Sequence, residues 1–209
     1  MEKTLVKIAL LGAESTGKTS LAQELATHLR AQGKTVAVIP EVLRQWCERE
    51  QRTPRPQEQL PIAQEQERRV DLAAPDHDIV ITDTTALMVA IYSAMLFEDG
   101  SLYRFALARQ RGYDFTLLTS LDLPWVADGL QRDGPHVREP VDRLIRQCLG
   151  DAGVPYRVVY GSGPERCINA LAAIDSQAAP AGNARPWKWT CEKCSDPQCE
   201  HRLFTGLRG

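Results

Sequence analysis

The sequence predicts an α/β fold in which helices cover both faces of a five-stranded parallel sheet. Three observations lead to this prediction. Short apolar segments alternate along the chain with longer segments of helical periodicity. The apolar segments lack the polar alternation of a half-exposed sheet, which indicates strands that are buried on both faces. The length of 209 residues suits one α/β core and is too short for two large domains.

The first half of the chain predicts two strands and three helices. Residues 5–11 form an apolar strand, and leucines at four-residue spacing after it predict an amphipathic helix. Gly33 is a suitable C-cap for that helix, and residues 35–39 predict the second strand. Two helices should follow, over residues 42–50 and 57–72, because the prolines between them must interrupt any helix.

The second half repeats the alternation. The remaining strands are expected in apolar segments rich in β-branched and aromatic residues, at residues 79–82, 115–119 and 156–160. Helices are expected at residues 85–97, 101–111, 141–149 and 165–174. A polar, glycine-bearing stretch covers residues 121–138. The carboxyl ends of parallel strands meet at one edge of a sheet, where ligands of such folds bind.

The composition changes after Asp175. Residues 176–186 are rich in alanine, proline and glycine without periodicity, which predicts a linker. Residues 187–209 form a short tail rich in cysteine and histidine. We therefore expect one folded domain over residues 1–175, a linker, and a separate cysteine-rich tail.

Composition and charge exclude several classes of protein. Hydrophobic residues make up 43% and charged residues 25%, as in ordinary globular proteins. The net charge of −2 makes a nucleic-acid partner unexpected. No apolar run approaches the ~18 residues of a membrane span, and the first strand begins too early for a signal peptide. We therefore expect a cytoplasmic protein with reduced cysteines. The oligomeric state stays open, a homo-oligomer included.

The most informative motif follows the first strand and fits G-x-x-x-x-G-K-[ST], the phosphate-binding loop. Its backbone N–H groups and the start of the next helix suit phosphate oxygens. Lys18 would reach the β- and γ-phosphates, and the Thr19 hydroxyl would bind Mg²⁺. A chance match is the alternative, but the preceding strand and following helix argue against it. The motif predicts a P-loop NTPase fold that binds ATP and Mg²⁺ through Gly12, Ala13, Glu14, Ser15, Thr16, Gly17, Lys18, Thr19 and Ser20.

Two carboxylates follow neighbouring strands of the first half. Asp83 ends the third strand and could hold Mg²⁺ together with Thr19, or could instead cap the following helix. Glu41 follows the second strand and could bind a substrate hydroxyl or accept its proton, with Arg44 one turn later as its partner. The alternative for Glu41 is a first-turn residue favoured by the helix dipole.

The stretch at residues 121–138 is too polar for a core segment. Arg132 and Arg138 could close onto the transferring phosphoryl group, as mobile lids do. Trp125 could cover a flat aromatic or cationic ring. The alternative is a solvated loop that contains a buried tryptophan.

The tail carries a cluster of four zinc-competent side chains, Cys191, Cys194, Cys199 and His201. Their spacing, C-x-x-C-x₄-C-x-H, is not one of the common finger spacings. A structural Zn²⁺ is the hypothesis, with a disordered or redox-active tail as the alternative.

The motifs favour a small-molecule kinase among the phosphate-loop proteins. A GTPase needs an N-K-x-D motif after a late strand, and the sequence has none. A motor ATPase normally has a glutamate beside the metal-binding aspartate, whereas Thr84 and Thr85 follow Asp83 here. An acceptor pocket and an arginine-bearing lid, which a kinase needs, both have candidates.

Several segments then carry a resemblance to one family. They are Gly12–Thr19 in the phosphate loop, Pro40-Glu41 with Arg44, Ile62-Ala63-Gln64-Glu65-Gln66, Thr82-Asp83-Thr84 and Asp122-Leu123-Pro124-Trp125-Val126-x-Asp128-Gly129. Together they resemble the ribosylnicotinamide kinase domain of bacterial NadR-type proteins, over about residues 5–174. The P-W-V-x-D-G and I-A-Q-x-Q segments are far more specific in combination than the phosphate loop.

The resemblance implies phosphorylation of the 5′-hydroxyl of nicotinamide riboside by ATP and Mg²⁺, giving nicotinamide mononucleotide. It implies that Lys18 and Thr19 serve ATP and Mg²⁺, that Asp83 is a metal ligand or base, and that Arg132 and Arg138 form a lid. Glu41, Arg44, Trp125 and Asp128 would belong to the nucleoside side.

With no adenylyltransferase or DNA-binding domain upstream, we expect a stand-alone kinase whose cysteine-rich tail has no counterpart in the family pattern. The alternatives are a kinase for another nucleoside or metabolite, and a nucleotide-dependent binding module with a zinc-bearing docking tail.

Overall fold

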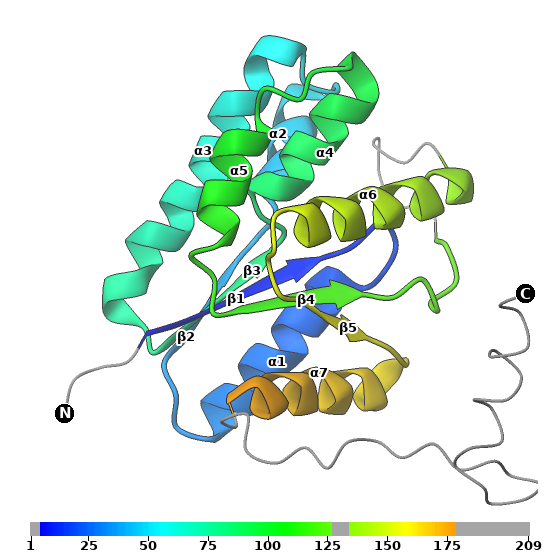
Figure 1. Cartoon of the computed structure of the whole chain (residues 1–209). Coiled ribbons are helices and arrows are strands. Elements are labelled where there is room, and N and C mark those ends of the chain that lie inside the picture. The colour runs from blue at the N-terminus through cyan, green and yellow to red at the C-terminus, as the bar shows by residue number, and fades with distance from the viewer. Residues whose placement is uncertain (1–4, 127–133, 179–209) are drawn as a thin grey trace, which may run out of the picture. The chain divides into compact units, whose positions relative to one another are not determined.

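The computed structural model, which describes residues 5–126 and 134–178, contains a five-stranded, all-parallel sheet (Figure 1). The strands lie in the order β2-β3-β1-β4-β5. Their bounds are β1 (Val6–Leu11), β2 (Val36–Ile39), β3 (Ile79–Asp83), β4 (Phe115–Thr119) and β5 (Arg157–Val159). The predicted fold class is confirmed, with β1 at the centre of the sheet.

The register of the sheet brings the carboxyl ends of its strands to one edge, which we call the carboxyl edge. Leu10 of β1 pairs with Asp83 of β3, and Ile39 of β2 pairs with Thr82. On the other side of β1, Leu11 pairs with Leu118 of β4. The segments that follow these four strands therefore start at the same level of the sheet.

Helices cover both faces of the sheet (Figure 1). One face carries α1 (Lys18–Ala31) and α7 (Gly163–Ala178). The other face carries α2 (Val42–Glu50), α3 (Pro56–Ala73), α4 (Ala86–Phe97), α5 (Tyr103–Gln110) and α6 (Arg138–Asp151). Short 3₁₀ turns lie at Ala74–Asp76 and Pro135–Val137. Within the described segments, every helix is too short or too polar to cross a membrane.

Each face of the sheet has its own apolar core. Leu10 and Leu117 pack with the leucines of α1, whereas their neighbours Leu11 and Leu118 pack with α4 and α6 on the opposite face. Successive side chains of a strand point to opposite faces, so a strand that is covered twice must be apolar at every position. This explains why the strands appear in the sequence as continuous apolar runs.

Two helices on the C-terminal side are longer than the sequence predicted. Helix α6 begins at Arg138 instead of residue 141, and α7 extends over Gly163–Ala178 instead of residues 165–174. Pro140 and Pro164 lie in the first turns of these helices, where a missing N–H removes no intrahelical hydrogen bond. Strand β5 is shorter than predicted because only Arg157–Val159 pairs with β4.

The end of α1 follows the predicted capping pattern. Gly33 has a positive φ of 81°, and its N–H donates to the carbonyl of Arg30 at 2.9 Å. The left-handed conformation favours glycine because a Cβ would add strain.

The cysteines of the described segments, Cys47, Cys148 and Cys167, are free thiols. Burial raises the pKa of the Cys47 thiol to about 11, with the Glu41 carboxylate adding to the effect. This thiol is therefore a core residue and not a reactive group.

A core substitution on α4 tests the packing of the helical layer. Leu87 is fully buried, whereas Leu72 at the end of α3 is 62% exposed. We expect Leu87→Ala to lower the free energy of unfolding by about 2–5 kcal/mol, and Leu72→Ala to change it by less than about 0.5 kcal/mol. Urea denaturation measures both. Equal effects of the two substitutions would contradict the packing described.

Candidate active site

The phosphate loop joins β1 to α1 and depends on two glycines. Gly12 has a φ of 151°, and a Cβ there would lie 2.0 Å from Thr119 Oγ1 on β4. Thr119 Oγ1 donates to Thr16 Oγ1 at 2.7 Å and lies 3.1 Å from the Leu11 carbonyl oxygen. Gly17 has a φ of 72° and precedes α1. The loop is therefore packed against the end of β4, with no space for a larger residue at Gly12.

The start of α1 presents positive potential to the loop. The helix begins at Lys18 without a side-chain cap and without an acidic residue in its first turn. Lys18 is 9% exposed, and its ammonium donates to the carbonyls of Gly12 at 2.9 Å and Ala13 at 2.8 Å. A helix N-terminus with a nearby lysine is the arrangement that binds phosphate oxygens.

Arg166 of α7 ties the phosphate loop to two other segments. It is 4% exposed and donates to the carbonyls of Thr16 at 2.7 Å and Gly161 at 2.6 Å. It also bonds Asp122 Oδ1 at 2.9 Å. Burial alone would raise the pKa of Asp122, but hydrogen bonds from Ser120, the Gly161 N–H and Arg166 lower it below its usual value. One guanidinium thus holds together the segments after β1, β4 and β5.

Asp83 and Thr19 form the part of the site that fits a metal ion. Asp83 is 2% exposed, and its Oδ2 accepts from Thr19 Oγ1 at 2.5 Å. Its Oδ1 is also buried, and no hydrogen bond from the described residues reaches it. A buried carboxylate oxygen that lacks a protein partner, beside a hydroxyl at the start of the phosphate-loop helix, suits Mg²⁺. Thr19 and Asp83 would hold the ion at this point.

The capping alternative for Asp83 is wrong. The N-cap of α4 is Thr85, whose Oγ1 accepts from the Leu87 N–H at 3.2 Å. Thr84, between Asp83 and Thr85, has a φ of 70°, a strained conformation for a β-branched residue. The chain therefore makes a sharp turn after Asp83, which leaves the carboxylate at the edge of the sheet instead of at the helix start.

Glu41 lies at the same edge as Asp83, at the start of α2. It is the N-cap residue by backbone conformation, but its carboxylate makes no capping hydrogen bond. Arg44 Nε lies 3.4 Å from Glu41 Oε2, as the sequence spacing predicted. Glu41 is 14% exposed and Arg44 39% exposed. The Glu41 carboxylate therefore lies largely buried beside Arg44 at the start of α2.

Trp125 is brought beside the phosphate loop by its neighbour. Ser15 Oγ donates to the Val126 carbonyl at 2.6 Å, and the Val126 N–H lies 3.2 Å from the same hydroxyl. The Trp125 Nε1 atom is buried, with no hydrogen-bond partner among the described residues. The segment after β4 and the phosphate loop thus form one surface.

Arg138 is the first residue of α6 and is only 8% exposed. It donates to the Leu121 carbonyl at 3.3 Å, which joins the two ends of the polar stretch. Its role as a lid residue remains a prediction. Other predicted site residues lie outside the described residues, namely Asp128, Arg132, Cys191, Cys194, Cys199 and His201.

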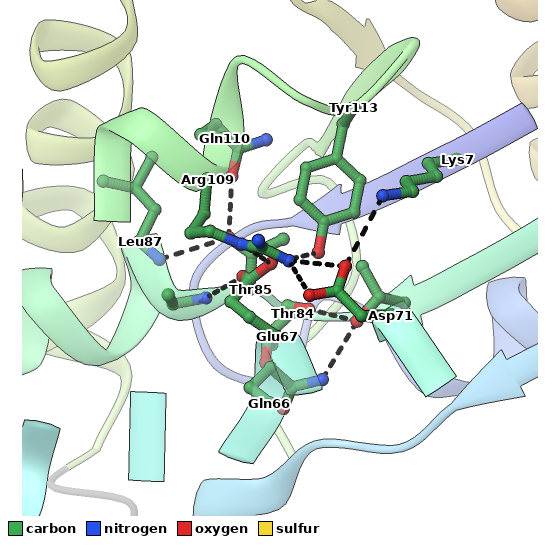
Figure 2. Close-up of polar contacts among 12 residues, drawn as sticks. Lys7, Gln66, Glu67, Asp71, Thr84, Thr85, Leu87, Arg109, Gln110 and Tyr113 are labelled. Carbon is green, nitrogen blue, oxygen red and sulfur yellow. Dashed lines mark hydrogen bonds and ion pairs between the residues drawn. The ribbon is translucent and has the colours of Figure 1, made fainter. Parts of the chain in front are cut away.

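Behind the site, a buried polar network joins α3, α4 and α5 (Figure 2). Glu67 of α3 is 3% exposed and accepts from the Ala86 N–H at 3.0 Å, from Tyr113 Oη at 3.0 Å and from Arg109 Nε at 3.3 Å. Arg109 also bonds both carboxylate oxygens of Asp71 at 2.6 Å. This network fixes the first turn of α4, which follows the Asp83 turn.

The sequence assigned no role to Arg166, and it marked Gln66 only through the family resemblance and Asp122 only as part of the polar stretch and of that resemblance. A signal for two of them was present. Gln66 lies four residues from both Ile62 and Val70, in the middle of the apolar stripe of α3. Arg166 likewise lies on the buried stripe of α7, four residues before Ala170. A polar residue on an apolar stripe indicates a buried group that needs specific partners.

The fold and a family match show to which group of proteins the chain belongs. The fold is that of phosphate-loop proteins, and residues 7–166 match the family described as AAA domain. The chain therefore belongs to this family. A comparison with curated sequences finds no match.

Solved structures with a similar fold include kinases. NadR in complex with NR is similar over 83% of this chain, with a TM-score of 0.69 and 19% identity. NadR in complex with NAD and AMP-PNP has a TM-score of 0.64 and 17% identity over 86% of this chain. The chain spans about half, 51%, of the length of both NadR chains. The predicted resemblance to NadR is thus confirmed at the level of the fold.

A deoxyadenosine kinase from M. mycoides is also similar, with a TM-score of 0.56 and 15% identity. That match covers 82% of this chain and 100% of the other.

A substitution of Arg166 tests its role in holding the loop. Arg166→Lys keeps the charge but cannot form all the bonds of the planar fork. We expect the free energy of unfolding to fall by about 1–3 kcal/mol. We also expect the affinity for an ATP analogue to fall by about tenfold, which corresponds to a loss of about 1.4 kcal/mol of binding free energy at the loop. Urea denaturation and calorimetric titration measure the two effects. Arg143→Lys, at an exposed position on α6, is the control and should change neither the stability nor the affinity. Wild-type stability and affinity in Arg166→Lys would refute the role of Arg166 in holding the loop.

Proposed function

We propose that this protein is an ATP-dependent kinase that phosphorylates the 5′-hydroxyl of nicotinamide riboside. The observation that carries the proposal is the pairing of Thr19 with the buried Asp83 beside the phosphate loop. This pairing supplies the donor half of a phosphotransfer site. Glu41 at the end of the neighbouring strand supplies an acceptor half at the same edge.

A kinase fits these residues better than a motor ATPase. Water activation in a motor ATPase calls for a second carboxylate directly beside the metal-binding aspartate. Here the next residues are Thr84, which makes the strained turn, and Thr85, which caps α4. Both are at most 3% exposed, so neither position offers a base to a water molecule.

The residues of this chain divide the work of phosphotransfer. Lys18 and the N–H groups at the start of α1 bind the phosphates and stabilise the charge that develops on the transferring group. Thr19 and Asp83 would hold Mg²⁺, which would supply further positive charge to the phosphates. Glu41 or Asp83 accepts the proton that the attacking hydroxyl loses, and Arg44 keeps the Glu41 side chain oriented.

The choice of nicotinamide riboside rests on two supports. The P-W-V-x-D-G and I-A-Q-x-Q segments resemble those of ribosylnicotinamide kinases, and the fold is similar to that of NadR in complex with NR. Trp125, whose segment is bonded to Ser15, is the side chain we assign to the flat, cationic nicotinamide ring.

A second acceptor class is favoured by a specific observation. The fold is also similar to that of a deoxyadenosine kinase. A kinase for another nucleoside would use the same donor half and differ only in the acceptor pocket.

Incubation with ATP, Mg²⁺ and a panel of nucleosides tests the proposal. We expect nicotinamide mononucleotide from nicotinamide riboside, detected by mass spectrometry, with slower turnover of deoxyadenosine, thymidine and uridine. Lys18→Ala and Asp83→Asn should each reduce turnover by at least about 10²-fold while the fold survives. If only another nucleoside is phosphorylated, the protein is a kinase for that nucleoside and not for nicotinamide riboside. ATP hydrolysis without any phosphorylated nucleoside would refute both.

We also propose that the tail binds one structural Zn²⁺ through Cys191, Cys194, Cys199 and His201. The segments 5–126 and 134–178 contain no group of three histidine, cysteine or acidic side chains that could hold a metal. Elemental analysis of the purified full-length protein should therefore find about one zinc per chain, and Cys191→Ser with Cys194→Ser should remove it. Protein without zinc, purified under reducing conditions, would contradict the site.

A further inference from the structure

Gln66 of α3 is a buried side chain that bonds to both strand ends carrying the candidate carboxylates. It is 1% exposed. Its Oε1 accepts from the Val42 N–H at 2.8 Å, and its Nε2 donates to Thr82 Oγ1 at 3.0 Å and to the Pro40 carbonyl at 3.4 Å. Val42 directly follows Glu41, and Thr82 directly precedes Asp83. One amide therefore spans the ends of β2 and β3.

We propose that Gln66 is a positioning residue that fixes the spacing between Glu41 of the acceptor half and Asp83 of the donor half of the site. The inference rests on the proposed kinase function for its catalytic consequence. Its structural part, the link between the two strand ends, is independent of the substrate.

The chemistry of an amide explains why glutamine stands at this position. The Val42 N–H can only donate, so the amide oxygen must face it and the nitrogen must face Thr82 and Pro40. An ionised glutamate could accept from Val42 but could not donate, and a leucine could do neither. The amide is therefore oriented by its partners, and it orients them in return.

The bond to Thr82 continues into the turn after Asp83. Thr82 Oγ1 accepts from Gln66 and donates to the Thr84 carbonyl at 2.6 Å. The N–H of Thr84 donates to the Leu10 carbonyl at 3.0 Å. A left-handed threonine costs roughly 1–3 kcal/mol and persists only where its surroundings hold it. The bonds from Gln66 through Thr82 are part of what holds it.

The next residue on α3 secures the far side of the same turn. Glu67 accepts from the Ala86 N–H at 3.0 Å, so Gln66 and Glu67 bond to residues on both sides of the turn. Figure 2 shows these two side chains reaching from α3 toward the turn that contains Thr84 and Thr85. The position of Asp83 is thus set by consecutive residues of one helix.

The phosphate loop itself does not depend on Gln66. The phosphate loop is held by Thr119 and Arg166, and neither side chain bonds to α3 in the described structure. Loss of the Gln66 amide should therefore disturb the chemical step and the acceptor while ATP binding is preserved.

The experiment compares Gln66→Leu with Gln59→Leu. Gln59 lies on the same helix and is also 1% exposed, but it makes no bond to either strand end. We expect Gln66→Leu to lower kcat by about 10- to 100-fold, as misplacement of reacting groups does, with the KM for ATP changed by less than threefold. Gln59→Leu should keep kcat within about threefold, and it should cost less stability than Gln66→Leu because Gln59 Oε1 is buried without a hydrogen-bond partner among the described residues.

Wild-type kcat in Gln66→Leu, or an equal loss in Gln59→Leu, would overturn the positioning role. If Gln66→Leu does not fold, Thr82→Val gives the second test, because it removes the hydroxyl that bonds both Gln66 and the Thr84 carbonyl. The loss of kcat in the double variant should be smaller than the combined losses of the two single variants. Fully additive losses would also overturn the positioning role.

Amide hydrogen exchange separates this inference from the proposed function. In Gln66→Leu, exchange should rise both around Val42 and in the turn at residues 82–86, with no such paired rise in Gln59→Leu. A paired rise in a protein that phosphorylates no nucleoside would refute the kinase and keep the link. Unchanged exchange in a working kinase would refute the link and keep the kinase.

Discussion

Polar groups at the carboxyl edge must find partners inside the protein, because helices cover the sheet on both faces. Unpaired buried donors or acceptors cost about 1–3 kcal/mol each. The edge carries many such groups, since four strands end there at matching levels. Several of them are satisfied by side chains of α3 and α7, on opposite faces of the sheet. The requirement for hydrogen-bond partners thus sets the geometry of the site.

The two halves of the site are supported by separate sets of bonds. Arg166 connects the phosphate loop with the segments after β4 and β5. Gln66 and Glu67 hold the carboxylate side. The hydrogen bond from Thr19 to Asp83 joins the two sets directly. Thr19 and Asp83 are also the residues that would hold Mg²⁺.

The turn after Asp83 separates the kinase hypothesis from the ATPase hypothesis on physical grounds. A strained Thr84 is costly, and the protein retains it with several hydrogen bonds around it. The turn keeps Asp83 out of the helix cap, which Thr85 forms, and leaves one carboxylate oxygen for a ligand. The geometry thus presents a single carboxylate at this strand end.

Periodicity and local motifs by themselves determined the five parallel strands, the phosphate loop, and the placement of Glu41 and Asp83 at strand ends, because these depend on contacts within a short segment. Tertiary structure alone decided the strand order, the earlier start of α6, and the choice of Thr85 over Asp83 as a helix cap. It also decided the partners of Gln66 and Arg166. Apart from Gly161, five residues before Arg166, their partners lie 16 to 150 residues away along the chain. A polar residue on an apolar stripe shows that a buried partner must exist, but only the folded chain determines which one it is.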